Sequence, residues 1–179
     1  MSISNNIAEV RQRIAAAARR AGRDPREITL LAVSKTFPPE RIREAYDAGL
    51  RLFGENRVQE FAGKVATLGD LKDAEWHLIG HLQSNKAAKA AELFSAVDSV
   101  DSLRLAEKLN ASAGQLGKKL AALIEINIGG ESAKSGVAPG SEELEGLLLA
   151  APQFEGPKLS HHCFNSTGYP FRKSEKGWL

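Results

Sequence analysis

The sequence has few of the features that mark secreted, membrane or nucleic-acid-binding proteins. Its single cysteine, Cys163, allows no internal disulfide, which fits a reducing cytoplasm. The longest apolar runs are far shorter than a membrane span, and residues 1–6 show no basic region followed by an apolar core. The 24 Lys and Arg residues are interspersed with 22 Asp and Glu residues, so no basic block forms. We therefore expect a cytoplasmic protein without a signal peptide, a membrane span or a nucleic-acid partner.

What remains is the composition of an ordinary soluble domain. Hydrophobic residues make up 42% of the chain and charged residues 26%. A length of 179 residues favours one domain with a substantial core.

Alternating strand and helix patterns predict a parallel α/β fold. An amphipathic helix runs to about Ala21 and precedes the first strand. Five apolar runs are typical of buried strands, at about Thr29–Ser34, Leu50–Gly54, Trp76–Gly80, Leu93–Val97 and Leu120–Ile128. Helical patterns follow these runs, and right-handed crossovers would place the helices outside the sheet. The expected N-caps of three later helices are Ser84, Asp101 or Ser102, and Ser141.

Lys35 is the residue with the most evident chemistry. It ends the first predicted strand, before Pro38 and Pro39. In α/β barrels the active site lies where the strands end, and a lysine amine held there can form a Schiff base with a carbonyl group. The alternative is a solvated lysine at a strand end, which this segment alone favours.

Polar residues also occupy the ends of the other predicted strands. They are Glu55 and Asn56, His77 and His81, Asp98, and Asn127. In a barrel these residues converge on one mouth, which predicts a site for a small molecule. Asn56 has an alternative role as a helix cap, and His77 as a histidine satisfied within the core.

Other patterns give weaker signals. Residues 129–136 form either a binding loop, with Lys134 as a second cation, or a flexible turn, and they lack the spacing of a phosphate loop. No metal site is predicted, because neither the pair His77 and His81 nor the run 161–163 has partners at suitable spacing. The glycosylation acceptor at 165–167 should be inert without a secretory signal.

Four blocks of sequence together resemble the pyridoxal-phosphate homeostasis protein family, which is related to the N-terminal barrel of alanine racemase. The blocks are residues 30–35, 54–60, 76–86 and 126–136. They occur in the family's order, and the similarity covers roughly Ile7 to Gly156. The resemblance implies a parallel (β/α) barrel of the alanine racemase N-terminal type, here incomplete with about five of eight strands.

The resemblance also implies the site and its function. Pyridoxal 5'-phosphate would be held as an aldimine on Lys35, with Asn56, His77 and Lys134 near the cofactor. No catalytic residue and no metal ligand is implied. The resemblance implies a carrier that serves intracellular cofactor homeostasis without substrate turnover. Its expected partners are apo forms of cofactor-dependent enzymes. An amino-acid racemase would need a second acid–base group on the other face of the cofactor.

The sequence departs from the family after Gly156. Residues 157–179 match nothing expected, and the family's Ser-Met-Gly-Met-Ser-like and Arg-x-Gly-like segments, which hold the phosphate, are missing. We therefore expect a partial barrel over residues 1–156 and an atypical, poorly ordered tail over 157–179, from a truncated or frameshifted gene. Open sheet edges and missing phosphate anchors predict weak cofactor retention, marginal stability and association. A racemase-like enzyme and a non-functional or partner-binding barrel fragment remain alternatives.

Overall fold

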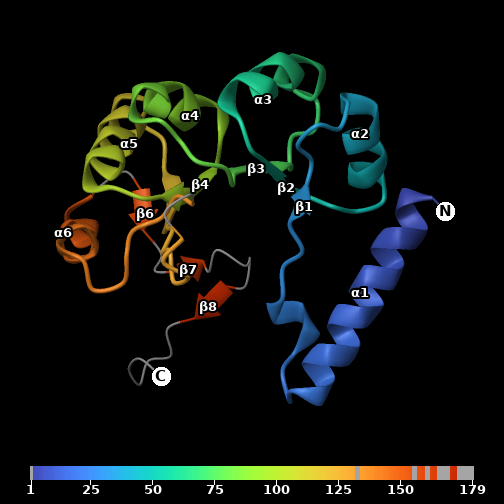
Figure 1. Ribbon diagram of the computed structural model, residues 1–179. Coiled ribbons are helices and arrows are strands. Elements are labelled where there is room, and N and C mark those ends of the chain that lie inside the picture. The colour runs from blue at the N-terminus through green and yellow to red at the C-terminus, as the bar shows by residue number, and fades with distance from the viewer. Residues whose placement is uncertain (1, 132–133, 155–156, 160–161, 165–169, 173–179) are drawn as a thin grey trace.

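The computed structural model describes residues 2–131, 134–154, 157–159, 162–164 and 170–172. Within these residues the chain forms a six-stranded sheet in the order β1-β2-β3-β4-β5-β6, and every neighbouring pair is parallel (Figure 1). The strands are β1 Ala32–Val33, β2 Leu52–Glu55, β3 Glu75–Leu78, β4 Ala96–Val100, β5 Leu120–Ile124 and β6 Pro157–Leu159.

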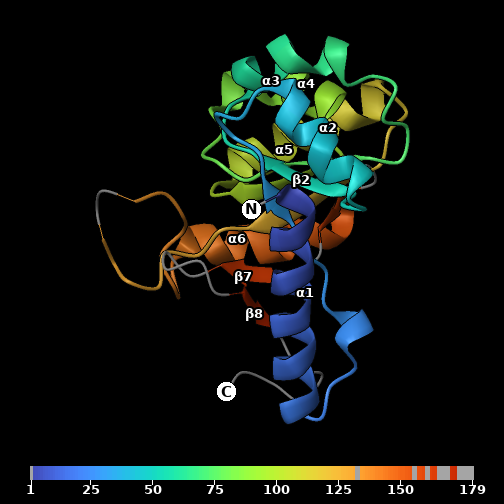
Figure 2. The same ribbon diagram turned by 90° about the vertical axis from the view of Figure 1, so that its right-hand side faces the viewer.

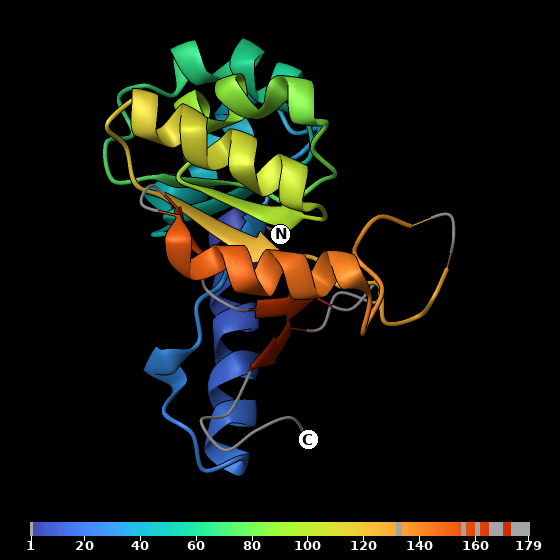
Figure 3. The same cartoon turned by 90° about the vertical axis from the view of Figure 1, so that its left-hand side faces the viewer.

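Helices cover one face of this sheet, as crossover connections between parallel strands require. The helices are α1 Ile3–Arg20, α2 Pro39–Asp47, α3 Val58–Lys64, α4 Ala87–Leu93, α5 Leu103–Gln115 and α6 Glu142–Ala150. Short 3-10 turns are η1 Pro25–Glu27, η2 Val65–Thr67, η3 Ser84–Lys86 and η4 Ala151–Gln153. α2 to α5 lie over the sheet, and α6 packs beside α5 (Figure 3). α1 stands apart and has its main contacts with α2 and η1 (Figure 2).

Aromatic rings fill the space between the sheet and its helices. Phe53 of β2 stacks on Trp76 of β3, with ring centroids 5.0 Å apart. Phe61 of α3 lies 4.7 Å from Trp76 and 4.9 Å from Phe94, measured between centroids. Phe53, Phe61 and Phe94 are buried. Large apolar side chains on this side of the strands therefore fix how the helices sit, while alternate residues face the opposite side of the sheet.

The five strands predicted from the sequence are confirmed as β1 to β5, with shifted ends. β4 begins at Ala96 and runs to Val100, so Asp98 lies inside the strand rather than after it. β5 ends at Ile124, and the predicted strand continues only as an isolated bridge between Ile126 and Val137.

The sheet also contains a strand that the sequence did not predict. β6 lies in the expected tail and pairs with β5, Leu120 facing Pro157. Three residues are too few to show an alternating pattern, and a proline at the first position of a sheet-edge strand is tolerated. β7 His162–Phe164 and β8 Pro170–Arg172 form a second, antiparallel pair. His161 and the predicted glycosylation acceptor at 165–167 lie outside the described residues.

Helix capping agrees with the sequence at two of three positions. The Ser102 hydroxyl accepts the Leu105 amide, and the Ser141 hydroxyl accepts the Leu144 amide. Ser84 was expected to cap a helix, but this is wrong, because it lies inside η3 and α4 begins only at Ala87. No helix among the described residues is long and apolar enough to cross a membrane.

Candidate functional site

The pairing register brings the predicted site residues to one end of the sheet. Val33 pairs with Gly54, Gly54 with His77, and His77 with Ala96. Lys35, Asn56 and Asp98 each lie two residues beyond one of these paired positions, and side chains two apart in a strand share a face. Lys35 and Asn56 follow β1 and β2, and His77 and Asp98 lie inside β3 and β4, so the register places all four on one face of the sheet. Figure 1 shows α2 to α5 over the opposite face.

Lys35 lies in a tight turn directly after β1. The Phe37 amide donates to the Ser34 carbonyl across 3.2 Å and closes the turn. Thr36 has a φ of 65°, in the left-handed region that non-glycine residues rarely adopt. The Lys35 side chain is exposed, and within the described part of the chain its amine has no hydrogen-bond or ion-pair partner. No described side chain therefore occupies the Lys35 amine.

A buried polar network lies under this turn. The Lys64 ammonium is 3.2 Å from Glu55 Oε1 and 2.8 Å from Glu60 Oε1. Glu55 is fully buried and also accepts a hydrogen bond from the Ser34 hydroxyl, at 2.8 Å. The pKa of Glu60 is lowered, first by the hydrogen bond from Lys64 and then by that from the Thr36 amide. None of this network is evident from the sequence, because its members come from the turn after β1, from β2 and from α3.

His77 has a defined ring orientation. Its Nδ1 lies 2.9 Å from Asp98 Oδ2, and the exposed fractions of the two side chains are 19% and 7%. The other carboxylate oxygen, Asp98 Oδ1, is buried without a partner among the described residues. A carboxylate on one ring nitrogen fixes the ring and leaves the second nitrogen for a ligand. The sequence placed Asp98 at a strand end but did not identify it as the partner of His77.

Asn56 follows β2 and is held against the next loop. A side chain at Gly80 would collide with the backbone carbonyl of Asn56, so the loops after β2 and β3 touch through their backbones. The helix-cap alternative for Asn56 is wrong, because Arg57 is the N-cap of α3 and makes no side-chain capping bond. The half-buried amide of Asn56 has no partner among the described residues.

Lys134 lies on a separate loop. Its ammonium contacts Glu131 at 2.8 Å, and the exposed fractions of the two side chains are 41% and 53%. Asn127 supports this loop by donating its side-chain amide to the Glu131 and Lys134 carbonyls. The described residues on either side of 132–133, between β5 and α6, extend away from the sheet (Figure 2). The structure brings Lys35, Asn56 and His77 to one end of the sheet and leaves Lys134 on this loop.

A second group of polar residues follows β3 to β5. His81 Nδ1 lies 3.0 Å from Asp101 Oδ2. Burial raises the pKa of Glu125, and the charge of Asp101 raises it further. Sequence reasoning missed Glu125, although an acid in the apolar run 120–128 was a usable signal. In the described ranges, no group of three or more His, Cys, Asp or Glu residues is arranged to hold a metal ion.

Comparisons with known proteins agree with this fold. The family model described as "Alanine racemase, N-terminal domain" matches residues 3–168. The pyridoxal phosphate homeostasis protein of Pseudomonas aeruginosa is 47% identical over 158 residues, which cover 88% of this chain and 67% of that protein. The protein of the same name from Escherichia coli is 50% identical over 159 residues, covering 88% of this chain and 66% of its own length. The chain thus spans about two thirds of these curated relatives.

Solved structures give the same result. PipY of Synechococcus elongatus with PLP bound has 38% identity and a TM-score of 0.75, over 91% of this chain and 69% of that one. Alanine racemase from Streptomyces lavendulae, at 20% identity and a TM-score of 0.62, covers 85% of this chain and 38% of its own and shows the fold alone. The chain belongs to the alanine racemase N-terminal domain family and, within it, to the pyridoxal phosphate homeostasis proteins.

Proposed function

We propose that this chain binds pyridoxal 5'-phosphate through Lys35 and serves cofactor homeostasis without substrate turnover. The observation that supports this best is the exposed, unpartnered amine of Lys35 at the end of β1, within the described residues. Relatives that are 47% and 50% identical are named for pyridoxal phosphate homeostasis, and the PipY structure contains the cofactor. We include apo forms of cofactor-dependent enzymes as the proposed recipients.

The residues present fit the reactive end of the cofactor. Its aldehyde condenses reversibly with a primary amine, and the aldehyde oxygen leaves as water. Lys35 supplies an amine that no neighbouring acid in the described ranges occupies. Lys64 is the nearby alternative in the fold, but its ammonium is held by Glu55 and Glu60 and is only 12% exposed. The chain therefore offers the cofactor Lys35 rather than Lys64.

The neighbouring residues would orient the bound molecule. His77 presents an aromatic ring whose Nδ1 is bound to Asp98, so the ring cannot turn freely. Asn56 adds an amide that can both donate and accept a hydrogen bond. We propose that these two side chains contact the cofactor, while Asp98 acts only through His77. Lys134 is proposed as a further contact, which would require its loop to approach Lys35.

Trapping with borohydride tests the proposed attachment. The full chain is incubated with pyridoxal 5'-phosphate, reduced, digested and mapped by mass spectrometry. We expect the label on Lys35 and its loss in Lys35→Ala, while the matched variant Lys134→Ala keeps the Lys35 label. Equal labelling of exposed lysines, or no label at all, would contradict the proposal.

The absence of turnover needs a separate assay. L-alanine is incubated with the cofactor-loaded chain, and the formation of D-alanine is followed by chiral chromatography. We expect none above the rate with free cofactor. A rate that disappears in Lys35→Ala would instead identify a racemase.

A further inference from the structure

The turn that contains Lys35 holds a strained residue. Thr36, with its φ of 65°, is the one non-glycine residue with a positive φ among those described. In a turn closed by the Phe37 amide and the Ser34 carbonyl, this position normally favours glycine or asparagine. A β-branched residue remains in such a conformation only where the surrounding structure holds it.

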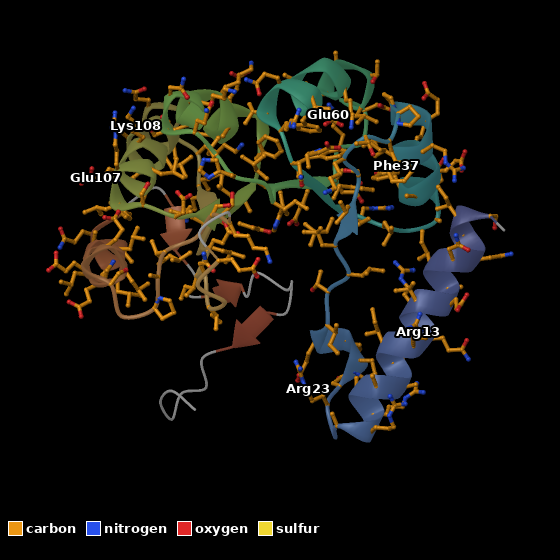
Figure 4. All side chains as sticks on the ribbon, viewed as in Figure 1. Arg13, Arg23, Phe37, Glu60, Glu107 and Lys108 are labelled. Carbon is orange, nitrogen blue, oxygen red and sulfur yellow. The ribbon has the colours of Figure 1, made fainter. Side chains whose placement is uncertain are left out.

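Glu60 supplies the bond that holds Thr36. The Thr36 amide donates to Glu60 Oε1 at 2.6 Å, across 24 residues of sequence. Glu60 lies in the first turn of α3. Figure 4 labels Glu60 on α3 and, close to it in this view, Phe37, the residue that follows Thr36. A hydrogen bond to an ionised carboxylate is stronger than one between neutral groups.

Lys64 extends this support to the other side of Lys35. Its ammonium donates to Glu60 Oε1 at 2.8 Å and to the Ser34 carbonyl at 3.3 Å. The backbone groups on both sides of Lys35, the Ser34 carbonyl and the Thr36 amide, are therefore bound by α3. The Lys35 amine itself takes no part in the network and stays free among the described groups.

We propose that Glu60, assisted by Lys64, is a positioning residue that fixes the turn presenting the Lys35 amine to its ligand. This rests on the proposed function of Lys35. Glu60 is bound to the backbone of the turn and to Lys64, and it acts through Thr36. A buried ionic network is a poor source of stability, because desolvation offsets the attraction of the charges. Because the network binds the backbone on both sides of Lys35, its role is better explained as fixing the conformation of this turn.

Amide hydrogen exchange tests the positioning without any cofactor. In the full chain, the Thr36 amide should exchange roughly tenfold or more faster in Glu60→Ala, since one charge-assisted hydrogen bond is lost. Glu60→Gln should show a smaller increase, because its side-chain carbonyl can still accept the Thr36 amide. Glu44→Gln is the matched control, since it removes a carboxylate from an exposed ion pair with Arg41 on α2 and should leave Thr36 unchanged.

Labelling of Lys35 by pyridoxal 5'-phosphate and borohydride is measured on the same variants. The initial rate should fall several-fold in Glu60→Ala and be partly restored in Glu60→Gln, with helix content by circular dichroism unchanged. If Glu60→Ala does not fold, Glu60→Gln alone decides, and both readouts must still change. Unchanged Thr36 exchange, or faster exchange with an unchanged labelling rate, would overturn the positioning role. A wild-type chain without label on Lys35 would instead overturn the proposed function.

Discussion

At the scale of single residues, the His77–Asp98 pair determines what the end of β3 can offer a ligand. The carboxylate binds Nδ1 at 2.9 Å and lies almost entirely out of solvent. A second pair, His81 and Asp101, has the same chemistry, but His81 is half exposed. The two pairs therefore allow a direct comparison of an ordered and a solvated histidine.

Replacing Asp98 should weaken cofactor binding. In Asp98→Asn the charged partner of His77 is lost, and we expect pyridoxal 5'-phosphate to bind a few-fold to tenfold more weakly, as for the loss of about 1 kcal/mol. The dissociation constant is measured by absorbance titration. Asp101→Asn serves as the control and should bind as the wild type does. Equal affinities for all three proteins would show that His77 needs no orientation.

The lowered pKa of Glu60 predicts a loss of stability in acid. A carboxyl group with a pKa below its ordinary value contributes stability above that ordinary value and loses it as the pH falls through the lower one. The groups that face Glu60 are Lys64, Arg57 and the Thr36 amide. The free energy of unfolding of the wild type should exceed that of Glu60→Gln at pH 7, and the difference should shrink as the pH falls through the lowered pKa of Glu60. Urea titrations over this range provide the measurement, and a constant difference would argue against it.

Glu125 should behave in the opposite way. Burial raises its pKa, so the folded chain bears a cost when this carboxyl group ionises. Glu125→Gln should therefore be more stable than the wild type at pH 7. This advantage should shrink as the pH falls through the raised pKa, where the wild type becomes neutral. Thermal melting of the wild type and of Glu125→Gln at pH 7 and pH 4 measures the advantage and its decrease. A variant that is less stable than the wild type at pH 7 would contradict the prediction.

Single residues also show the limit of sequence reasoning. Local patterns predicted that Lys35 and His77 lie at strand ends, whereas their assignment to a cofactor site came from the resemblance to the family. The partner of His77 lies 21 residues away and that of Thr36 lies 24 away, so both depend on how strands and helices pair. Glu55 and Lys64 form a buried ion pair that no local pattern indicates.

At the scale of elements, the sequence predicted which helices and strands form better than it predicted where they end. The first helix was expected to end near Ala21, and α1 ends at Arg20. β4 was misplaced because Phe94 belongs to the core under the helices, whereas Asp98 and Ser99 lie inside the strand. One carboxylate oxygen of Asp98 contacts His77 and the Ser99 hydroxyl donates to the Gly80 carbonyl, and both contacts exist only in the assembled sheet.

The aromatic cluster under α3 should dominate the stability of this layer. Phe61 is fully buried between Trp76 and Phe94. Phe61→Ala should lower the free energy of unfolding by about 3–5 kcal/mol, the range for removing a buried aromatic ring. Phe37→Ala is a matched control, because Phe37 is 51% exposed, and should change stability by less than about 0.5 kcal/mol. Urea unfolding measures both, and similar losses would show that the cluster is not a core.

At the scale of the whole molecule, the sheet is open. The described strands run from β1 to β6 without pairing of the two ends, so this sheet has two edges. On the uncovered face Val33 is 47% exposed. Exposed strand edges with apolar neighbours favour association with other chains.

Self-association should therefore rise with protein concentration. Sedimentation velocity is expected to show oligomers that decrease in Val33→Lys, because a charge on an edge strand opposes pairing. The control Leu149→Lys removes an apolar side chain that is 74% exposed on α6, away from this edge, and should keep the wild-type behaviour. A wild-type chain that sediments as a monomer at every concentration would contradict this prediction.

The separate position of α1 has a consequence for how the chain opens. α1 is held mainly through α2 and η1, with one hydrogen bond from Arg11 to the Gly49 carbonyl. Because α1 has so few contacts with the rest of the fold, it can unfold locally while the other elements stay intact. The amides of residues 3–20 should then exchange with solvent well before those of β2 to β5. The first cooperative opening of this protein would leave the Lys35 turn and its network in place.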